Sequence, residues 1–120
     1  MKKLLIGIAV CLFASFVGCS TYAEDAYESI RMANDHIQTV GIENAEMVQI
    51  TNHGMGVIKR MDDEGTADNE TWIIASEGCR LMSDWLTTLA IIIKEPEKSE
   101  LLEAAADYST AGDCFLKMAE

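Results

Sequence analysis

The apolar residues of this chain recur at spacings of three and four over three long stretches, a pattern typical of helices with one buried face. The first stretch predicts a helix over residues 25–40 that stops at Gly41. The second predicts a helix over 71–94. The third predicts a helix that follows Ser99, a good N-cap residue, and continues almost to the C-terminus. We therefore expect a mainly α fold, built as a small helical bundle.

Residues 46–61 leave two structures open. Their two apolar segments fit a short β-hairpin around a turn at Gly54. The same residues also fit a second helix that breaks near Gly54 and Gly56, because a glycine inside a helix costs roughly 1 kcal/mol. We favour the helix and keep the β-hairpin as the alternative.

Residues 62–70 are rich in acids and contain no large apolar side chain, which is typical of an exposed loop. An EF-hand calcium loop that uses Gly65 as its fixed glycine would have Arg60 as its first ligand, so that pattern fails. We predict a solvated loop that can serve as a contact surface for a basic partner. The candidate contact residues are Asp62, Asp63, Glu64, Asp68 and Glu70.

The predicted helix over 71–94 is apolar around most of its circumference. Beside its main apolar stripe it carries a second set, which consists of Ile74, Leu81, Trp85 and Ile92. A helix of this kind is either central in its domain or buried in an oligomer. We therefore expect a homodimer, with Trp85 and Ile92 as candidate seam residues.

Two cysteines lie at equal distances from the only proline-containing break, Glu95-Pro96-Glu97. If the flanking helices fold back antiparallel about this break, Cys79 and Cys114 arrive at the same height and can form a disulfide. Such a bond would add roughly 3–4 kcal/mol in the chain-entropy model. A disulfide-stapled helical hairpin also implies an oxidising compartment.

The N-terminus has the pattern of a secretory signal. Two lysines precede an apolar run over residues 4–17, which is too short to span a membrane, and small residues follow it. Cleavage after Ala23 predicts a signal peptide over 1–23 and one helical domain over 24–120, located in the periplasm. The alternative is cleavage before Cys19, with Cys19 lipidated and the protein anchored in the cell envelope.

The chain after residue 23 carries seven basic and twenty acidic residues, a net charge of −13. This balance argues against binding to nucleic acid or to anionic lipid, because both require lysine and arginine. It favours a cationic partner, since opposite charges steer encounter.

No catalytic constellation stands out in the sequence. His36 and His53 are the only histidines, and the neighbour of His36 in sequence, Asp35, points away from it on a helix. No Gly-x-Ser-x-Gly motif is present, and two cysteines without nearby histidines make a poor zinc site. We expect a protein that is not an enzyme and holds no metal or cofactor.

The signal over 1–23, the acidic domain and the Cys79/Cys114 pair together resemble small periplasmic immunity proteins of bacterial type VI secretion systems. The resemblance implies an exported, largely helical and often dimeric protein that neutralises a peptidoglycan-degrading effector. The expected function is therefore inhibition, by binding, of a basic secreted peptidoglycan hydrolase. The alternatives are a small structural or assembly lipoprotein anchored through Cys19, and a binding protein for a small cationic or apolar ligand between the helices.

Overall fold

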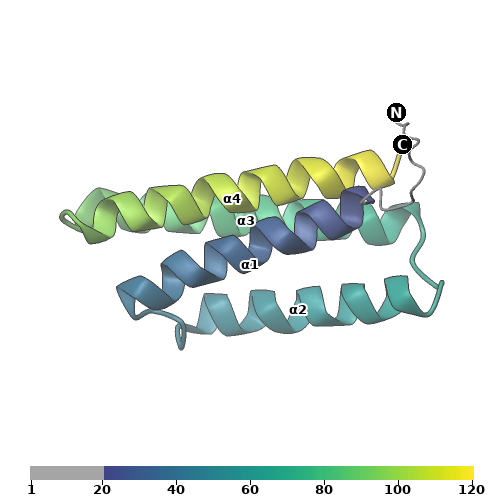
Figure 1. The fold of residues 1–120 in the computed structure, drawn as a ribbon, viewed down its shortest axis with the longest axis horizontal. Helices are drawn as coiled ribbons and strands as arrows, with labels where there is room; N and C mark the ends of the chain where they lie inside the picture. Colours follow the sequence, from purple (N-terminus) through teal and green to yellow (C-terminus); the bar gives the residue numbers. More distant parts are fainter. Residues whose placement is uncertain (1–20) are drawn as a thin grey trace, which may run out of the picture.

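The computed structural model describes residues 21–120, which form four helices (Figure 1). No strand is present within these residues, so the prediction of a mainly helical bundle is confirmed. The predicted leader and Cys19 lie outside the described residues, apart from positions 21–23. The helices are α1 (Tyr22–Val40), α2 (Glu46–Asp63), α3 (Asn69–Ile92) and α4 (Glu97–Met118).

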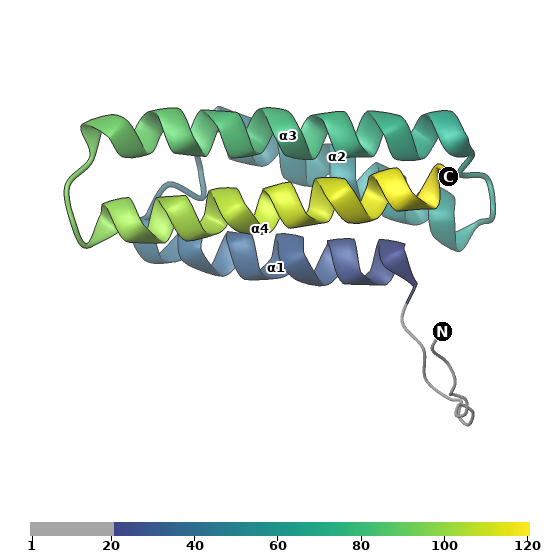
Figure 2. The ribbon, with the colours of Figure 1, turned by 90° about the horizontal axis from the view of Figure 1, so that it is seen from above.

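The four helices are not packed equally. α4 packs along α1 on one side and along α3 on the other, antiparallel to both (Figure 2). α2 runs beside α3 with much sparser contact, and it approaches α1 only through side chains. One of these contacts joins Asn34 Nδ2 to Asn52 Oδ1 at 3.1 Å. α2 is thus the least supported helix of the bundle.

α1 starts three residues earlier than its apolar pattern suggests, because a capping box closes its first turn. Thr21 Oγ1 accepts a hydrogen bond from the Glu24 N–H at 3.0 Å, and Glu24 Oε1 accepts one from the Thr21 N–H at 3.1 Å. Ala23 then lies in the core with no exposed surface. α1 ends as predicted at Gly41, whose φ of 89° is left-handed and suits glycine.

α2 is one continuous helix through both glycines, so the β-hairpin over 46–61 is wrong, and so is a break at Gly54 or Gly56. The buried side chains Val48 and Ile58, with the half-buried Met55 between them, repeat at helical spacing and face the rest of the bundle. Burial of this stripe offsets the cost of the two glycines. Tertiary packing therefore decides a segment in which local signals conflict.

The core lies where α1, α3 and α4 meet. Phe115 of α4 stacks on Trp72 of α3 with ring centroids 5.8 Å apart, and it meets the edge of Tyr27 of α1 at 5.6 Å. Farther along, α3 and α4 approach closely where Ser76 Oγ donates to the Gly112 carbonyl at 2.8 Å. A Cβ at Gly112 would lie 3.3 Å from the Ser76 carbonyl oxygen, so glycine permits this approach.

Cys79 and Cys114 are free thiols in this structure, so the predicted staple is not confirmed. The α3–α4 register is fixed by the Ser76–Gly112 hydrogen bond and by a Ser83–Ala105 bond of 2.8 Å, and both pairs are centred on residue 94. The cysteines are centred between 96 and 97, so they do not share the centre of these two pairs. Cys79 lies against Gly112, two residues before Cys114: a Cβ added at Gly112 would be 3.4 Å from the Cys79 Cβ. A disulfide needs the two Cβ atoms about 4 Å apart, and the two thiols are not bonded in this structure.

Candidate functional site

The five acidic residues predicted to form one exposed loop are distributed over two helices and their connection. Asp62 and Asp63 belong to the last turn of α2, and Glu64 is its C-cap. Asp68 is the N-cap of α3, and Glu70 lies in the first turn of that helix. The prediction of a loop over 62–70 is therefore wrong at both ends, because the helices extend into it and leave a connection of only a few residues.

Three of these carboxylates have partners within the domain. Asp62 accepts a hydrogen bond of 3.5 Å from the Tyr27 hydroxyl, and Asp63 lies 3.3 Å from Lys59 Nζ. Burial, followed by these two carboxylates, raises the pKa of Tyr27. Asp68 accepts hydrogen bonds from the Thr71 N–H at 2.9 Å and the Thr71 hydroxyl at 2.8 Å, which lower its pKa. Asp68 is therefore part of the structure of α3.

A largely apolar groove of about 340 Å³ lies between α2 and α3. Met55 of α2 extends across Gly78 of α3, where an added Cβ would lie 3.3 Å from the Met55 methyl carbon. Thr51 Oγ1, the polar group of the groove, lies 3.5 Å from Met82 Sδ. The groove exists because α2 packs sparsely and α3 has no side chain at Gly78. Its walls include Met47, Ile50 and Ile58 of α2, and Ile74, Ala75 and Leu81 of α3.

Three large apolar residues of these walls are exposed to solvent. Ile50 is 60% exposed, Ile74 57% and Leu81 65%, and we call these three residues the α2–α3 strip. The two residues predicted as a dimer seam differ from each other. Trp85 is half-buried against the core, whereas Ile92 is 76% exposed near the end of α3. Of the second apolar set, Ile74, Leu81 and Ile92 are thus exposed, and the dimer seam at Trp85 and Ile92 stays a prediction.

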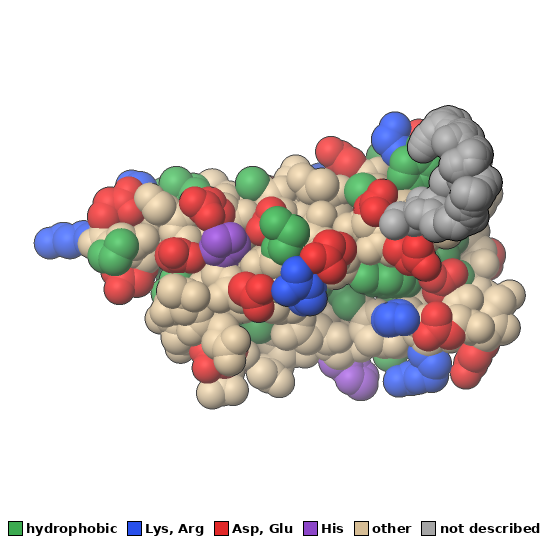
Figure 3. All heavy atoms as spheres, viewed as in Figure 1, with side chains coloured by type: hydrophobic (Ala, Val, Ile, Leu, Met, Phe, Trp, Pro, Cys, Tyr) green, Lys and Arg blue, Asp and Glu red, His purple; other side chains and the backbone are tan. Residues whose placement is uncertain are grey.

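A second groove of about 340 Å³ lies on the other side of α2, between α1 and α2. Its rim is polar and includes Arg31 and Lys59, which are already paired with neighbouring carboxylates. Met55 borders both grooves and separates them. Acidic side chains are scattered over the face that contains α1, α4 and one side of α2, with few lysines and arginines among them (Figure 3).

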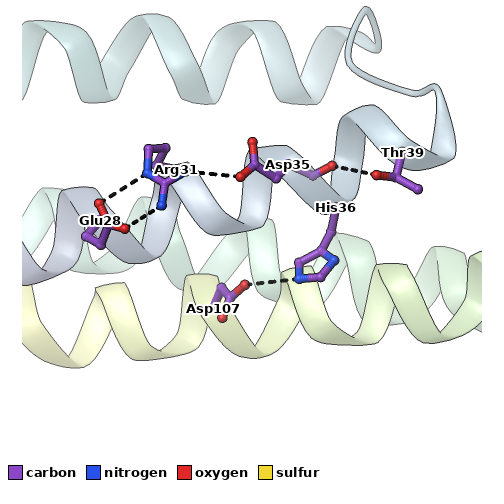
Figure 4. A network of polar contacts seen from close by, with 6 residues as sticks. All are labelled: Glu28, Arg31, Asp35, His36, Thr39 and Asp107. Carbon is purple, nitrogen blue, oxygen red and sulfur yellow. Dashed lines mark hydrogen bonds and ion pairs between the residues drawn. The ribbon is translucent and has the colours of Figure 1, made fainter.

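His36 projects from α1 toward α4, where Figure 4 shows it facing Asp107. His36 Nδ1 lies 2.6 Å from Glu100 Oε1, and Nε2 lies 3.3 Å from Glu103 Oε1 and 3.8 Å from Asp107 Oδ2. The hydrogen bond with Glu100 is the main cause that raises the pKa of His36. Burial raises the pKa of Asp107, whose Oδ2 atom has no hydrogen-bond partner among residues 21–120. The cluster ties α1 to α4 most strongly when His36 is protonated.

The other histidine and the two cysteines lie outside the His36 cluster. His53 is exposed on α2, whereas His36 lies on α1, and His53 forms no hydrogen bond within the described residues. Burial raises the pKa of the Cys79 thiol to about 12, which keeps it protonated and unreactive at neutral pH. Over residues 21–120, no set of histidine, cysteine, aspartate or glutamate side chains is arranged to hold a metal ion.

Sequence reasoning missed both the His36 cluster and the α2–α3 groove. The cluster had a weak signal, since Glu100, Glu103 and Asp107 recur at spacings of three and four and so share one face of α4. Recognising that face as the partner of His36 requires the α1–α4 register. The groove had a signal in Gly78, which interrupts an otherwise apolar face of α3.

Comparison with protein-family models, with curated proteins and with solved structures finds no match to this chain. Among residues 21–120, no helix combines the length and the apolar character that crossing a bilayer requires.

Proposed function

We propose that this protein is a periplasmic inhibitor that binds and blocks a basic secreted peptidoglycan hydrolase without catalysing a reaction itself. The observation that carries the proposal is an exposed apolar strip on a domain of charge −13. An apolar patch framed by charge of one sign is typical of a surface that binds a protein of opposite charge. The resemblance to immunity proteins of type VI secretion systems supports the same function.

The acidic residues contribute to this function by steering. Glu64 and Glu70 are exposed and form no ion pair within the described residues, so they are the members of the predicted contact set that are free to meet a cation. Asp62, Asp63 and Asp68 already have partners, and a complex would have to compete with those contacts. Exposed charges at the rim of an interface act mainly on the association rate and its salt dependence.

A binding measurement with the hydrolase encoded beside this gene tests the proposal. Biolayer interferometry should give a complex whose association slows as salt increases, and hydrolysis of cell walls should fall when the inhibitor is added. The double variant Glu64→Gln/Glu70→Gln should associate more slowly, whereas the matched variant Glu46→Gln/Glu97→Gln, at the opposite end of the bundle (Figure 1), should not. A hydrolase that binds neither the wild-type chain nor its variants would remove this function.

The second candidate is a small structural or assembly lipoprotein anchored through Cys19. It is favoured by the capping box and by buried Ala23, because cleavage before Cys19 keeps these residues and cleavage after Ala23 removes them. The two candidate functions are distinguished by two measurements. Mass spectrometry of the exported protein identifies the lipid, and the hydrolase assay identifies the inhibitor.

We include a homodimer and a Cys79–Cys114 disulfide in the proposal, and both are open to test. Trp85 and Ile92 remain the predicted dimer seam, to be tested by light scattering. The disulfide requires the Cβ atoms of the two cysteines to lie about 4 Å apart. Non-reducing peptide mapping of the exported protein would detect the cross-link, and two free thiols would exclude it.

A further inference from the structure

We propose that the α2–α3 groove is the docking site for a basic amphipathic helix of the partner protein. The inference rests on the proposed function, and it moves the main contact surface from the acidic connection to the side of the bundle. Its basis is the combination of an apolar groove, a notch in its α3 wall and a row of unpaired carboxylates beside it.

The α3 wall has the spacing that a docked helix requires. Ile74, Gly78 and Leu81 lie at positions i, i+4 and i+7, so they share one face of α3. The two large residues are ridges, and Gly78 between them leaves a notch. An amphipathic helix recognises such a wall by placing an apolar side chain in the notch and others on either side. The unbranched side chain of Met55, which now lies over the notch, can move aside.

Carboxylates adjoin the same wall. Glu70, Glu77 and Asp84 are each three or four residues from Ile74 or Leu81, which makes them their neighbours on the helix surface. All three are exposed, and none forms an ion pair within the described residues, not even with nearby Arg80. An apolar strip bordered by acids matches a helix that has leucines on one face and lysines or arginines beside them. The same carboxylates disfavour anionic lipid and a second copy of this acidic chain.

The α1–α2 groove lacks these features. Its cations Arg31 and Lys59 are engaged by Glu28, Asp35 and Asp63, and its polar rim offers no continuous apolar wall. We therefore place the docked helix of the partner in the α2–α3 groove and not in the α1–α2 groove.

The test uses a synthetic peptide of about 18 residues, long enough for several helical turns, with leucine on one helical face and lysine on the other. Isothermal titration should show binding to the wild-type chain, and Leu81→Asn should weaken it at least about tenfold. Ile74→Asn is a second variant of the same wall. Leu102→Asn is the matched control, since Leu102 is a 42% exposed leucine on α4 and its loss should leave binding unchanged.

The charge contribution is tested separately. The triple variant Glu70→Gln/Glu77→Gln/Asp84→Asn should bind the peptide more weakly at low salt and with less salt dependence. A peptide of the same composition, scrambled so that its leucines share no face, should bind far more weakly than the amphipathic one. Circular dichroism should show unchanged helicity in every variant, because the replaced side chains are exposed.

Several results would overturn the inference. Equal binding of the peptide to wild type, Leu81→Asn and Ile74→Asn would show that the wall is not the site. Equal binding of the scrambled peptide would show charge attraction without a groove. A wild-type dimer that Leu81→Asn dissociates would show that a second copy occupies the strip. The proposed function fails independently: a chain that binds the peptide through Leu81 but binds no hydrolase keeps the site and loses that function, while a hydrolase bound equally by Leu81→Asn keeps the function and loses the site.

Discussion

Removing residues 21–23 should destabilise the whole bundle, and this prediction bears directly on where the mature protein begins. A chain that starts at Glu24 loses the Thr21 N-cap, the fully buried Ala23, and the contact of the Tyr22 ring with Lys117 Nζ, which lies 5.8 Å from the ring centroid. It also places a positive α-amino group on the first turn of α1, where the helix dipole disfavours it.

The size of the loss follows from these contacts. Loss of an N-cap threonine costs about 1 kcal/mol, and loss of a buried methyl group about 0.8 kcal/mol. An unfavourable charge at a helix N-terminus adds roughly 0.3–1 kcal/mol, and an exposed cation–π contact about 0.5 kcal/mol. Together they predict a loss of about 3 kcal/mol, a large share of the roughly 5–15 kcal/mol that holds a domain folded.

Urea unfolding followed by circular dichroism measures this loss. A chain that starts at Cys19, with that cysteine replaced by serine, is compared with one that starts at Glu24. Thr21→Ala in the longer chain should cost about 1 kcal/mol by itself. Thr39→Ala is the control, because Thr39 bonds only to the Asp35 carbonyl inside α1 and its removal should cost nothing. Equal stability of the two chains would refute the reasoning and leave cleavage after Ala23 acceptable.

Four further substitutions test the energetics of the bundle by urea unfolding. Gly54→Ala and Gly56→Ala should each stabilise α2 by about 0.5–1 kcal/mol, since an added Cβ meets nothing within 4 Å; a loss of stability would show that α2 needs its glycines. The pKa of His36 is raised in the folded chain, so its stabilising effect is complete below the unfolded pKa of about 6.5 and is lost as pH rises through the higher folded value. His36→Gln should therefore remove a fall in stability that sets in near the unfolded pKa of about 6.5 and continues as pH rises through the higher folded pKa, and an unaltered pH profile would contradict this assignment. Ser76→Ala should cost about 0.5–1.5 kcal/mol through the lost bond to Gly112, and an unchanged midpoint would show that bond to be negligible.

The parts of the fold that follow from sequence are those with a strong, uninterrupted period. In α1, α3 and α4, apolar residues recur at spacings of three and four without a break, and burial of one helix face requires that pattern. α2 was ambiguous because Gly54 and Gly56 weaken the helix locally, while the burial that sustains it depends on α3. The predicted Cys79–Cys114 disulfide likewise depends on how two helices pack. The prediction assumed that Pro96 marks the centre of the hairpin, but the register is set by close packing at Ser76 and Gly112.

The candidate site could be predicted only in outline. The sequence contains the exposed apolar set and the excess of acid, and these features predict a binding surface. It does not contain the α2–α3 spacing that turns Ile74, Leu81 and Ile50 into one strip, nor the helix extensions that place Asp62 and Asp68 in structural roles. Both depend on where helices end and how closely they pack, and neighbouring residues in sequence do not determine that.

The sign of the salt dependence separates the two ways in which the α2–α3 strip can be covered. In a two-fold dimer through the strip, Glu70, Glu77 and Asp84 of one copy would face carboxylates of the other, so added salt should screen the repulsion and strengthen association. A basic helix in the groove would meet the same carboxylates as attractive partners, so added salt should weaken it. We expect the second behaviour in titrations with the leucine–lysine peptide, and sedimentation equilibrium should show no gain of dimer with salt. If salt strengthens self-association and Leu81→Asn abolishes it, the strip is a homodimer interface in addition to the predicted seam of Trp85 and Ile92, and the partner must bind elsewhere.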